Sequence, residues 1–270
     1  IEKEDAYSCC FYVLILSKVI NYNLFAPNLY LYIRNFNNLF AMKKWIVSFW
    51  SLFFPPCCVV CGRVLLDGEA HLCTSCNMDM PRTYFHLQEG NVAEQLFWGR
   101  IPIVRAASYF FYTKGSRFKN LLYDLKYHDN KELGYFMGRN MAKELQPTAF
   151  FEGVDVILPV PLHPARKRKR GYNQSELIAR GVSHVSGVPV DVLSLYREVN
   201  SSTQTRKSTF ERWENVEKVF ALHPSCDFSN KHILLVDDVL TTGSTLVACA
   251  SLLASYKNVR ISVLTLAMAA

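Results

Sequence analysis

The chain has 270 residues and a formal charge of +7, with half of its residues apolar and a fifth charged. This ordinary globular composition allows one medium-sized domain plus a smaller module, with a core large enough to fold without disulfides. Nine cysteines are too few for a disulfide scaffold, so that class is excluded. The charge favours anionic partners, and five of the 30 basic residues stand in one run at 166–170, which indicates a site feature and not general surface charge.

Residues 1–41 show no clear helical or strand period. We expect the native protein to start at Met42, so that residues 1–41 are a non-native or disordered extension. Segment 42–56 predicts an apolar helix that ends at the proline pair 55–56. Its apolar run is short for a membrane span of about 20 residues, so core packing is favoured over an anchor. The acidic residues near the start do not match a secretory signal, and we expect a cytoplasmic protein with no firm membrane partner, although residues 45–54 leave membrane association open.

Two Cys-x-x-Cys pairs predict a metal site in a zinc-ribbon module at residues 57–82. The four thiols belong to Cys58, Cys61, Cys73 and Cys76. Two residues between thiolates make a tight turn, so two such pairs supply the tetrahedral four-sulfur site that suits Zn²⁺. Gly62 fits the turn after the first pair, where positive φ is often needed. Structural zinc is favoured over a redox dithiol, and His71 is expected to be a surface residue and not a further ligand.

The charge of this module argues against nucleic-acid binding. Residues 57–82 contain two basic and three acidic side chains, a net charge of −1. A phosphate-binding surface needs the opposite sign. The module is therefore expected to be structural, which also weakens the hypothesis of a zinc-ribbon transcription factor.

From residue 100 to residue 270, predicted strands and helices alternate. Strands are predicted at 104–112, 154–158, 191–196, 217–222, 232–236 and 260–266. Helices are predicted at 118–126, 131–145, 175–185 and 244–256. This alternation indicates an α/β fold with a largely parallel sheet flanked by helices. Ligands of such sheets bind beyond the carboxyl ends of the strands, so the residues that follow each strand are the candidates for the site.

Two acids and a hydroxyl-rich loop follow the apolar strand residues 233–236. Adjacent carboxylates such as Asp237 and Asp238 are costly to desolvate unless a cation or hydrogen-bonding group meets them, and a sugar diol with an associated Mg²⁺ meets both needs. The loop leads into a predicted helix and consists of Thr241, Thr242, Gly243, Ser244 and Thr245. Backbone N–H groups at a helix start make a phosphate cradle. A simple helix cap needs one hydroxyl residue, so a phosphate site is favoured.

The second strand, 154–158, is followed by a short proline-containing loop and the basic run. That run contains Arg166, Arg168 and Arg170. Because arginine binds phosphate oxygens in bidentate fashion, the position after a strand favours pyrophosphate binding. A solvated loop and a nucleic-acid patch stay open as alternatives, and the two binding uses can coexist.

Together these segments resemble a known family. Residues 233–245 are similar to the 5-phosphoribosyl-1-pyrophosphate motif of type I phosphoribosyltransferases. The pattern Pro-Leu-His-x-x-Arg-x-Arg-x-Arg-Gly-Tyr-Asn-Gln-Ser, at residues 161–175, resembles that of the ComF family, which is associated with bacterial competence and DNA uptake. In that family a four-cysteine module precedes the transferase domain, as here. The segment 126–128 resembles a Lys-Tyr segment of the family, and 204–216 resembles its mobile loop.

The resemblance implies a type I phosphoribosyltransferase fold over residues 100–270, with Mg²⁺-bound phosphoribosyl pyrophosphate as donor. It implies that Asp237 and Asp238 hold the ribose hydroxyls and that residues 241–245 hold the 5-phosphate. Pro161 and Leu162 are expected to lie at the donor too. The arginines of the basic run are expected to stabilise the leaving pyrophosphate.

The acceptor cannot be read from the sequence. His128 and His163 are candidate bases, although a surface or loop-packing role is favoured for each. Two other functions stay open. The chain could bind the donor without transferring it, as a factor in DNA uptake, or it could contact single-stranded DNA through the run at 166–170.

Overall fold

The computed structural model describes residues 55–127, 130–198 and 219–270. The chain divides into two compact units, with the boundary between Asp79 and Met80. The expected extension, nearly all of the predicted helix at 42–56, and the segment 204–216 lie outside the described residues. The domain limits 57–82 and 100–270 stay predictions. Within the described ranges, no helix is long and apolar enough to cross a membrane.

The first unit has little regular structure in its described part, residues 55–79. Two isolated antiparallel bridges join Cys57 to Val64 and Ala70 to Leu72. The short helix α4 (Thr74–Met78) follows, and the Sγ atom of Cys73 accepts a hydrogen bond from the N–H of Cys76 at its start. A segment this small buries too little apolar surface to be stabilised by a core alone, so a metal-binding cluster would contribute much of its stability.

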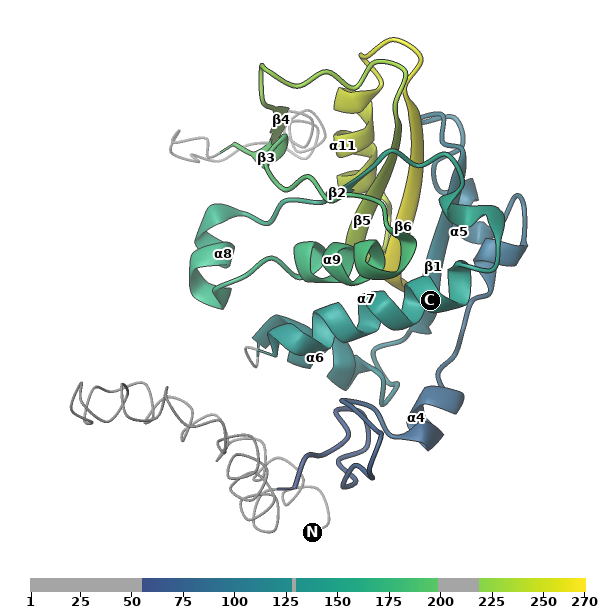
Figure 1. Ribbon diagram of the computed structural model, residues 1–270, viewed down its shortest axis with the longest axis vertical. Helices are drawn as coiled ribbons and strands as arrows, with labels where there is room; N and C mark the ends of the chain where they lie inside the picture. Colours follow the sequence, from purple (N-terminus) through teal and green to yellow (C-terminus); the bar gives the residue numbers. More distant parts are fainter. Residues whose placement is uncertain (1–54, 128–129, 199–218) are drawn as a thin grey trace, which may run out of the picture. The chain divides into compact units, whose positions relative to one another are not determined.

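The second unit is built on a four-stranded parallel sheet (Figure 1). In sheet order its strands are β1 (Arg105–Tyr112), β6 (Arg260–Ala269), β5 (His232–Leu240) and β2 (Val156–Pro159). All three neighbouring pairs are parallel. The apolar run 233–236 in the central strand β5 is fully buried, as expected of a strand covered on both faces. The predicted α/β fold with a parallel sheet is confirmed.

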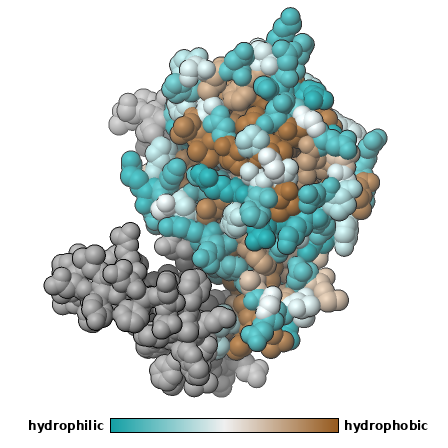
Figure 2. Space-filling view, viewed as in Figure 1, coloured by the Kyte–Doolittle hydropathy of each residue, from teal (hydrophilic) through white to brown (hydrophobic). Residues whose placement is uncertain are grey.

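Helices flank this sheet. They are α5 (Val92–Gln95), α6 (Lys119–Tyr127), α7 (Lys131–Leu145), α8 (Pro164–Arg170), α9 (Gln174–Ser186) and α11 (Ser244–Leu253), with 3₁₀ turns at Phe85–Leu87 and Ala149–Phe151. α7 and α9 lie side by side against the sheet, whereas α11 returns along β5 from its carboxyl end (Figure 1). A space-filling view of the same face shows apolar patches enclosed by hydrophilic side chains (Figure 2).

Two glycines allow α7 and α9 to approach until their backbones touch. A Cβ atom at Gly138 would collide with the carbonyl oxygen of Ile178, and one at Gly181 would collide with the carbonyl oxygen of Tyr135. Backbone atoms cannot move aside as a flexible side chain can, so only glycine fits at either position. The pair therefore sets the distance between α7 and α9, and α9 carries residues of the site described below.

The basic run forms a helix, α8, which the sequence analysis did not predict. The Nδ1 atom of His163 accepts a hydrogen bond from the N–H of Ala165 at 3.1 Å, Pro164 occupies the first turn, and Gly171 ends the helix with a φ of 81°. A polar cap, a proline in the first turn and a glycine after the end are ordinary helix boundary signals. Five consecutive cations obscured them in the sequence.

Two predicted strands lie apart from the main sheet. β3 (Leu195–Arg197) and β4 (Phe220–Leu222) pair with each other in antiparallel register. Both are shorter than the predicted strands at 191–196 and 217–222. The main sheet is therefore smaller than the count of predicted strands suggested, because three-residue strands contribute too few hydrogen bonds and side chains to reveal their partners in the sequence.

Candidate functional site

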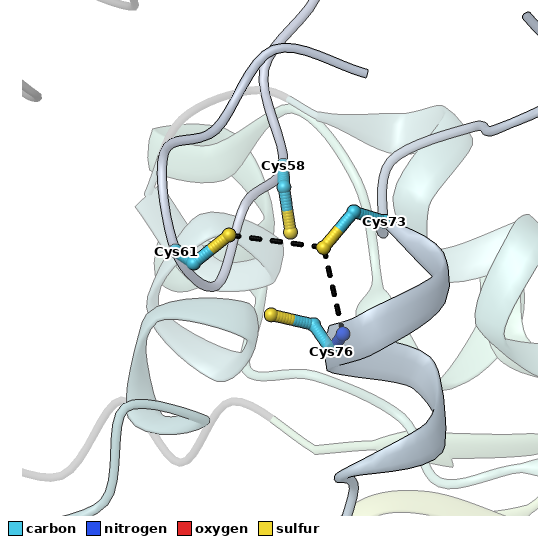
Figure 3. A group of neighbouring side chains, drawn as sticks. All are labelled: Cys58, Cys61, Cys73 and Cys76. Carbon is cyan, nitrogen blue, oxygen red and sulfur yellow. Dashed lines mark hydrogen bonds between the residues drawn. The ribbon is translucent and has the colours of Figure 1, made fainter. Parts of the chain in front are cut away.

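The first candidate site is the cysteine cluster of the first unit (Figure 3). The sulfur atoms of Cys58, Cys61, Cys73 and Cys76 all lie within 4.8 Å of one another and turn toward a common centre. The Sγ atoms of Cys61 and Cys73 are 3.8 Å apart. Four sulfurs at about 2.3 Å from one zinc ion in a tetrahedron would be separated by about 3.8 Å. The predicted ligands are therefore brought together in a geometry compatible with a small zinc module.

The surroundings of the cluster favour the thiolate at Cys73, whereas burial raises the pKa of Cys58 and of Cys76. Gly62 has a φ of 72°, as predicted for the turn after the first pair. The Nη2 atom of Arg63 lies 3.5 Å from the sulfur of Cys73. Burial opposes ionisation of Cys73, but hydrogen bonds from Cys76 and the other thiols outweigh it and lower the pKa of Cys73 to about 7. A bound divalent cation would favour the thiolate form at all four positions.

The second candidate site lies in the second unit, at the carboxyl end of β5. The Oδ1 atom of Asp237 accepts hydrogen bonds from the Oγ–H of Ser175 and from the N–H of Asp238, each at 2.8 Å. The Oδ2 atom of Asp238 forms an ion pair with the Nζ atom of Lys126 at 2.9 Å. Three elements meet here, because Ser175 belongs to α9 and Lys126 to α6. The two predicted acids are thus held in place from both sides.

The two carboxylates influence each other's ionisation. Burial and, after it, the negative charge of Asp238 raise the pKa of Asp237 to about 7. The hydrogen bond from Ser175 and the charge of Lys126 act in the opposite direction but are weaker. The pair therefore gains its second negative charge only near neutral pH. A ligand that offers hydroxyl donors or a cation would compensate this charge.

The predicted phosphate loop, 241–245, connects β5 to α11. Gly243 precedes the helix with a φ of 72° and has no side chain to cap it. The side-chain oxygens of Thr242 and Ser244 are 3.0 Å apart, and Thr241, Thr242 and Thr245 are exposed. The free N–H groups of a helix start, surrounded by exposed hydroxyls, form an anion cradle. The loop lies directly after the acid pair, as predicted.

The predicted arginines of α8 point in different directions. Because each helical residue turns by about 100°, Arg168 lies on the opposite side of the helix from Arg166 and Arg170. The guanidinium carbon of Arg170 lies 5.4 Å from the ring centroid of Tyr127 in α6. Arg168 instead lines an open pocket of about 310 Å³. The three arginines are therefore not brought to one point.

The pocket beside Arg168 is predominantly cationic. Its lining residues come from α8, the loop after β2, the start of α9 and the segment of β3. Its lining includes Pro161 and Leu162, both predicted at the donor, and the cationic side chains of Lys167, Arg168 and Arg197. The acid in this lining, Glu176, is bound by Arg180 at 2.8 Å. The pocket thus has a net positive lining beside the loop that the sequence predicted to hold pyrophosphate.

Arg197 was not found by the sequence analysis. Its Nε atom is buried and makes no hydrogen bond in the part of the chain that the structure describes. Burial and, after it, the positive charge of Arg166 lower the pKa of Arg197. Its guanidinium also lies 5.3 Å from the ring centroid of Phe220. The positive charges of the two guanidinium groups repel each other, and a bound anion would offset this repulsion. A lone arginine at the end of a short predicted strand gave no usable signal.

Only one of the two candidate bases, His163, lies among the described residues. His163 caps α8, in agreement with the loop-packing role favoured for it. His128 lies outside the described residues. Ser175 and Lys126 were quoted only as parts of family patterns, and their contacts with the acids come from the fold.

Comparisons with known proteins identify the family of the chain. The family described as phosphoribosyl transferase domain matches residues 132–269. The DNA utilization protein YhgH of Shigella flexneri is 30% identical over 200 residues, which cover 73% of this chain and 83% of the relative. Competence protein F of Haemophilus influenzae is 37% identical over 100 residues, covering 37% of this chain and 44% of the relative. A solved hypoxanthine phosphoribosyltransferase from Staphylococcus aureus is 17% identical, with a TM-score of 0.32, covering 50% of this chain and 62% of the other.

The matched region contains α8, the acid pair and the phosphate loop. The chain therefore belongs to the phosphoribosyltransferase-domain family and, within it, to the ComF family.

Proposed function

We propose that the chain binds Mg²⁺–phosphoribosyl pyrophosphate and transfers its phosphoribosyl group to an acceptor with release of pyrophosphate. The observation that carries the proposal is the placement of two acids at the carboxyl end of β5, directly before a glycine-headed helix start. The acids suit a ribose diol, and the helix start suits the 5-phosphate. The family match supports this donor class.

The proposed reaction breaks the bond between the anomeric carbon and a pyrophosphate oxygen. The acceptor nucleophile forms the new bond to that carbon, and pyrophosphate leaves with the electron pair. Asp237 and Asp238 orient the sugar through its hydroxyls, while Arg168 and Arg197 stabilise charge on the leaving group. Mg²⁺, carried by the donor, supplies further neutralisation of the pyrophosphate charge. Lys126 holds Asp238 in place until the ribose binds.

Calorimetric titration of the full chain with phosphoribosyl pyrophosphate tests this proposal. Binding should require Mg²⁺, and it should be lost in Asp238→Ala. Glu89→Gln is the matched control, because Glu89 is an exposed acid of the same unit, outside the site. Failure of folded wild-type protein to bind the donor would refute the proposal.

We also propose that the cysteine cluster holds structural Zn²⁺. Metal analysis should find one zinc ion per chain, lost in Cys76→Ser but kept in Cys226→Ser, because Cys226 lies outside the cluster. Removal of the ion should unfold the first unit, since metal binding and folding are coupled in such modules. A zinc-free protein that keeps its thermal stability would contradict this role.

A second candidate function is binding of single-stranded DNA, in place of catalysis or beside it. The exposed rings of Tyr123 and Tyr127 in α6 lie 4.7 Å apart, and Arg170 lies over Tyr127. Aromatic rings with adjacent cations are the groups on which bases of a single strand stack. Two relatives are named DNA utilization protein and competence protein, and these names favour DNA binding as a function.

Fluorescence anisotropy with a labelled oligonucleotide separates the two functions. If DNA binds at α6 and α8, Tyr127→Ala and Arg170→Ala should weaken it, and its affinity should fall steeply with salt. Asp238→Ala should leave DNA binding intact. Equal affinity in all variants would exclude this surface.

A further inference from the structure

Arg100 touches the phosphate loop from a part of the chain in which the sequence gave no motif. Its Nη1 atom donates a hydrogen bond to the carbonyl oxygen of Thr242 at 2.8 Å, and its Nη2 atom donates to the Oγ atom of Ser244 at 3.4 Å. Residue 100 lies outside the region that the family match covers, residues 132–269. One guanidinium therefore bridges the two residues on either side of Gly243.

The turn that carries Arg100 is well fixed. Its Nη1 atom also donates to the carbonyl oxygen of Leu96 at 3.2 Å, and its backbone N–H donates to the carbonyl oxygen of Phe97 at 3.0 Å. The ring of Phe97 is fully buried and approaches Gly243, where a Cβ atom would lie 3.6 Å from it. An exposed arginine usually loses side-chain entropy when it forms a contact. Here the contacts at its base and tip already restrict it.

The segment before Arg100 is fastened to the edge strand of the sheet. Asn91 caps α5, and its Nδ2 atom donates to the carbonyl oxygen of Ala106 in β1 at 3.0 Å. The Oε1 atom of Glu94 accepts from the N–H of the same residue at 3.3 Å. The phosphate loop is consequently braced against β1 as well as being joined to β5.

We propose that Arg100 is a positioning residue for the 5-phosphate end of the donor, an inference that rests on the proposed function. Its bond to Thr242 fixes the backbone just before Gly243. Its bond to Ser244 occupies a lone pair of the hydroxyl oxygen, and the hydroxyl proton can turn from the neighbouring oxygen of Thr242 toward a bound phosphate. Its positive charge adds to the attraction of the α11 N-terminus for an anion.

Three ligands distinguish a role of Arg100 at the 5-phosphate from a general effect on ligand binding. Ribose 5-phosphate carries only the 5-phosphate end, pyrophosphate carries only the leaving group, and phosphoribosyl pyrophosphate carries both. Arg100→Ala should weaken the first and third by about tenfold, because two charge-assisted contacts that order the loop are lost. Its affinity for Mg²⁺–pyrophosphate should stay at the wild-type value.

Two further variants sharpen the test. Arg100→Lys keeps the charge, but a single ammonium group cannot reach both Thr242 and Ser244 as a planar fork does, so it should remain several-fold weaker than wild type. Arg260→Ala is the matched control, since Arg260 is exposed and its guanidinium contacts the carbonyl oxygen of Gly153 at the amino-terminal end of β6. It should bind all three ligands normally.

Calorimetric titration of the full chain, with competition for the weaker ligands, measures these affinities, and thermal unfolding verifies each variant's fold. Unchanged affinity of Arg100→Ala for ribose 5-phosphate would overturn the inference. So would an equal loss for pyrophosphate, or full recovery in Arg100→Lys. Wild-type protein that binds no phosphoribosyl pyrophosphate would overturn the proposed function together with this inference, whereas a normal wild type with an unaffected Arg100→Ala would overturn the inference alone.

Discussion

The strands β5 and β2 are parallel neighbours in the sheet, yet the groups at their carboxyl ends are organised differently. In the last residues of β5 before its carboxyl end, Asp237 is bound by Ser175 and Asp238 by Lys126, and the loop that follows the strand is bridged by Arg100. Beyond β2, the cations of α8 are mostly exposed and spread around a short helix. One end is ordered by close hydrogen bonds and an ion pair from other elements, and the other presents charge with looser contacts.

This difference assigns different costs to the two ends of a bound donor. Groups already held in position lose little freedom when a ligand arrives, whereas long exposed side chains lose rotamer entropy when they gather around it. We therefore expect the ribose and 5-phosphate to contribute most of the affinity. The pyrophosphate end should contribute more to the reaction, where charge develops on the leaving group.

The largest effect should come from Asp238→Asn. This change removes a charged ligand of the ribose and leaves Lys126 without its partner. Affinity for phosphoribosyl pyrophosphate should fall by about a hundredfold, since the loss of one charge-assisted hydrogen bond costs about 1.5–3 kcal/mol. Calorimetry measures the loss. A weaker effect here than in any α8 variant would reverse the comparison between the two ends.

Two variants compare the contributions of single cations to pyrophosphate binding. They are Arg197→Ala and Arg170→Ala. Arg197 lines the pocket beside Arg168, so its removal should reduce pyrophosphate affinity by about tenfold. Arg170 lies over Tyr127, and its removal should cost about threefold or less, as expected for a charge near the protein surface. Competition assays with pyrophosphate distinguish the two. Equal losses would mean that α8 rearranges around the ligand.

The raised pKa of Asp237 predicts how stability depends on pH. The folded protein holds this proton more tightly than the unfolded chain does. Its stabilising contribution is therefore complete below the ordinary value of 3.8 and is lost as the pH rises through about 7. Relative to Asp237→Asn, the free energy of unfolding of the ligand-free wild type should fall by about 2–3 kcal/mol between pH 5 and pH 8.

Urea unfolding of both proteins across this range measures that difference. Near pH 8, Asp237→Asn should be the more stable protein and also the weaker binder of phosphoribosyl pyrophosphate. Parallel curves for the two proteins would show that Asp237 ionises normally.

A modest, pH-dependent effect should come from Ser175→Ala. Loss of one hydrogen bond to Asp237 removes about 1 kcal/mol of support for the ionised form, so the pKa of this carboxyl should rise further. Donor affinity at pH 7 should drop by about fivefold and recover partly at pH 8.5. Titrations at the two pH values test this, and a loss that does not depend on pH would assign Ser175 a purely steric role.

The sequence predicted the ordered end well. The two acids stand near the end of a buried strand, and the hydroxyl-rich helix start begins after two intervening residues, so local backbone geometry alone brings residues 237–245 together. The four cysteines were predictable for the same reason, because each pair is a single tight turn. The parallel direction of the main sheet's strands followed from the alternation of strands and helices.

The other contacts of the site depend on chain segments distant in sequence. The packing of three other elements brings Lys126, Ser175 and Arg100 to the site. These elements are α6, α9 and the segment after α5. No local sequence pattern predicts the contacts of these residues with the acids or the phosphate loop. The sequence analysis treated the five adjacent cations as one group because it did not predict helix α8. A helix points successive side chains in different directions, so the charges are spread around it.

Gly138 and Gly181, at the crossing of α7 and α9, have a consequence for how this sequence can vary. Neither residue touches a candidate ligand, yet a methyl group at either would meet backbone atoms of the partner helix and push apart the two helices, one of which carries Ser175. In a library of all single substitutions selected for donor binding, these two positions should tolerate as few replacements as the acids themselves. The site therefore depends on glycine at two positions of the helix crossing, although neither residue carries a reactive side chain.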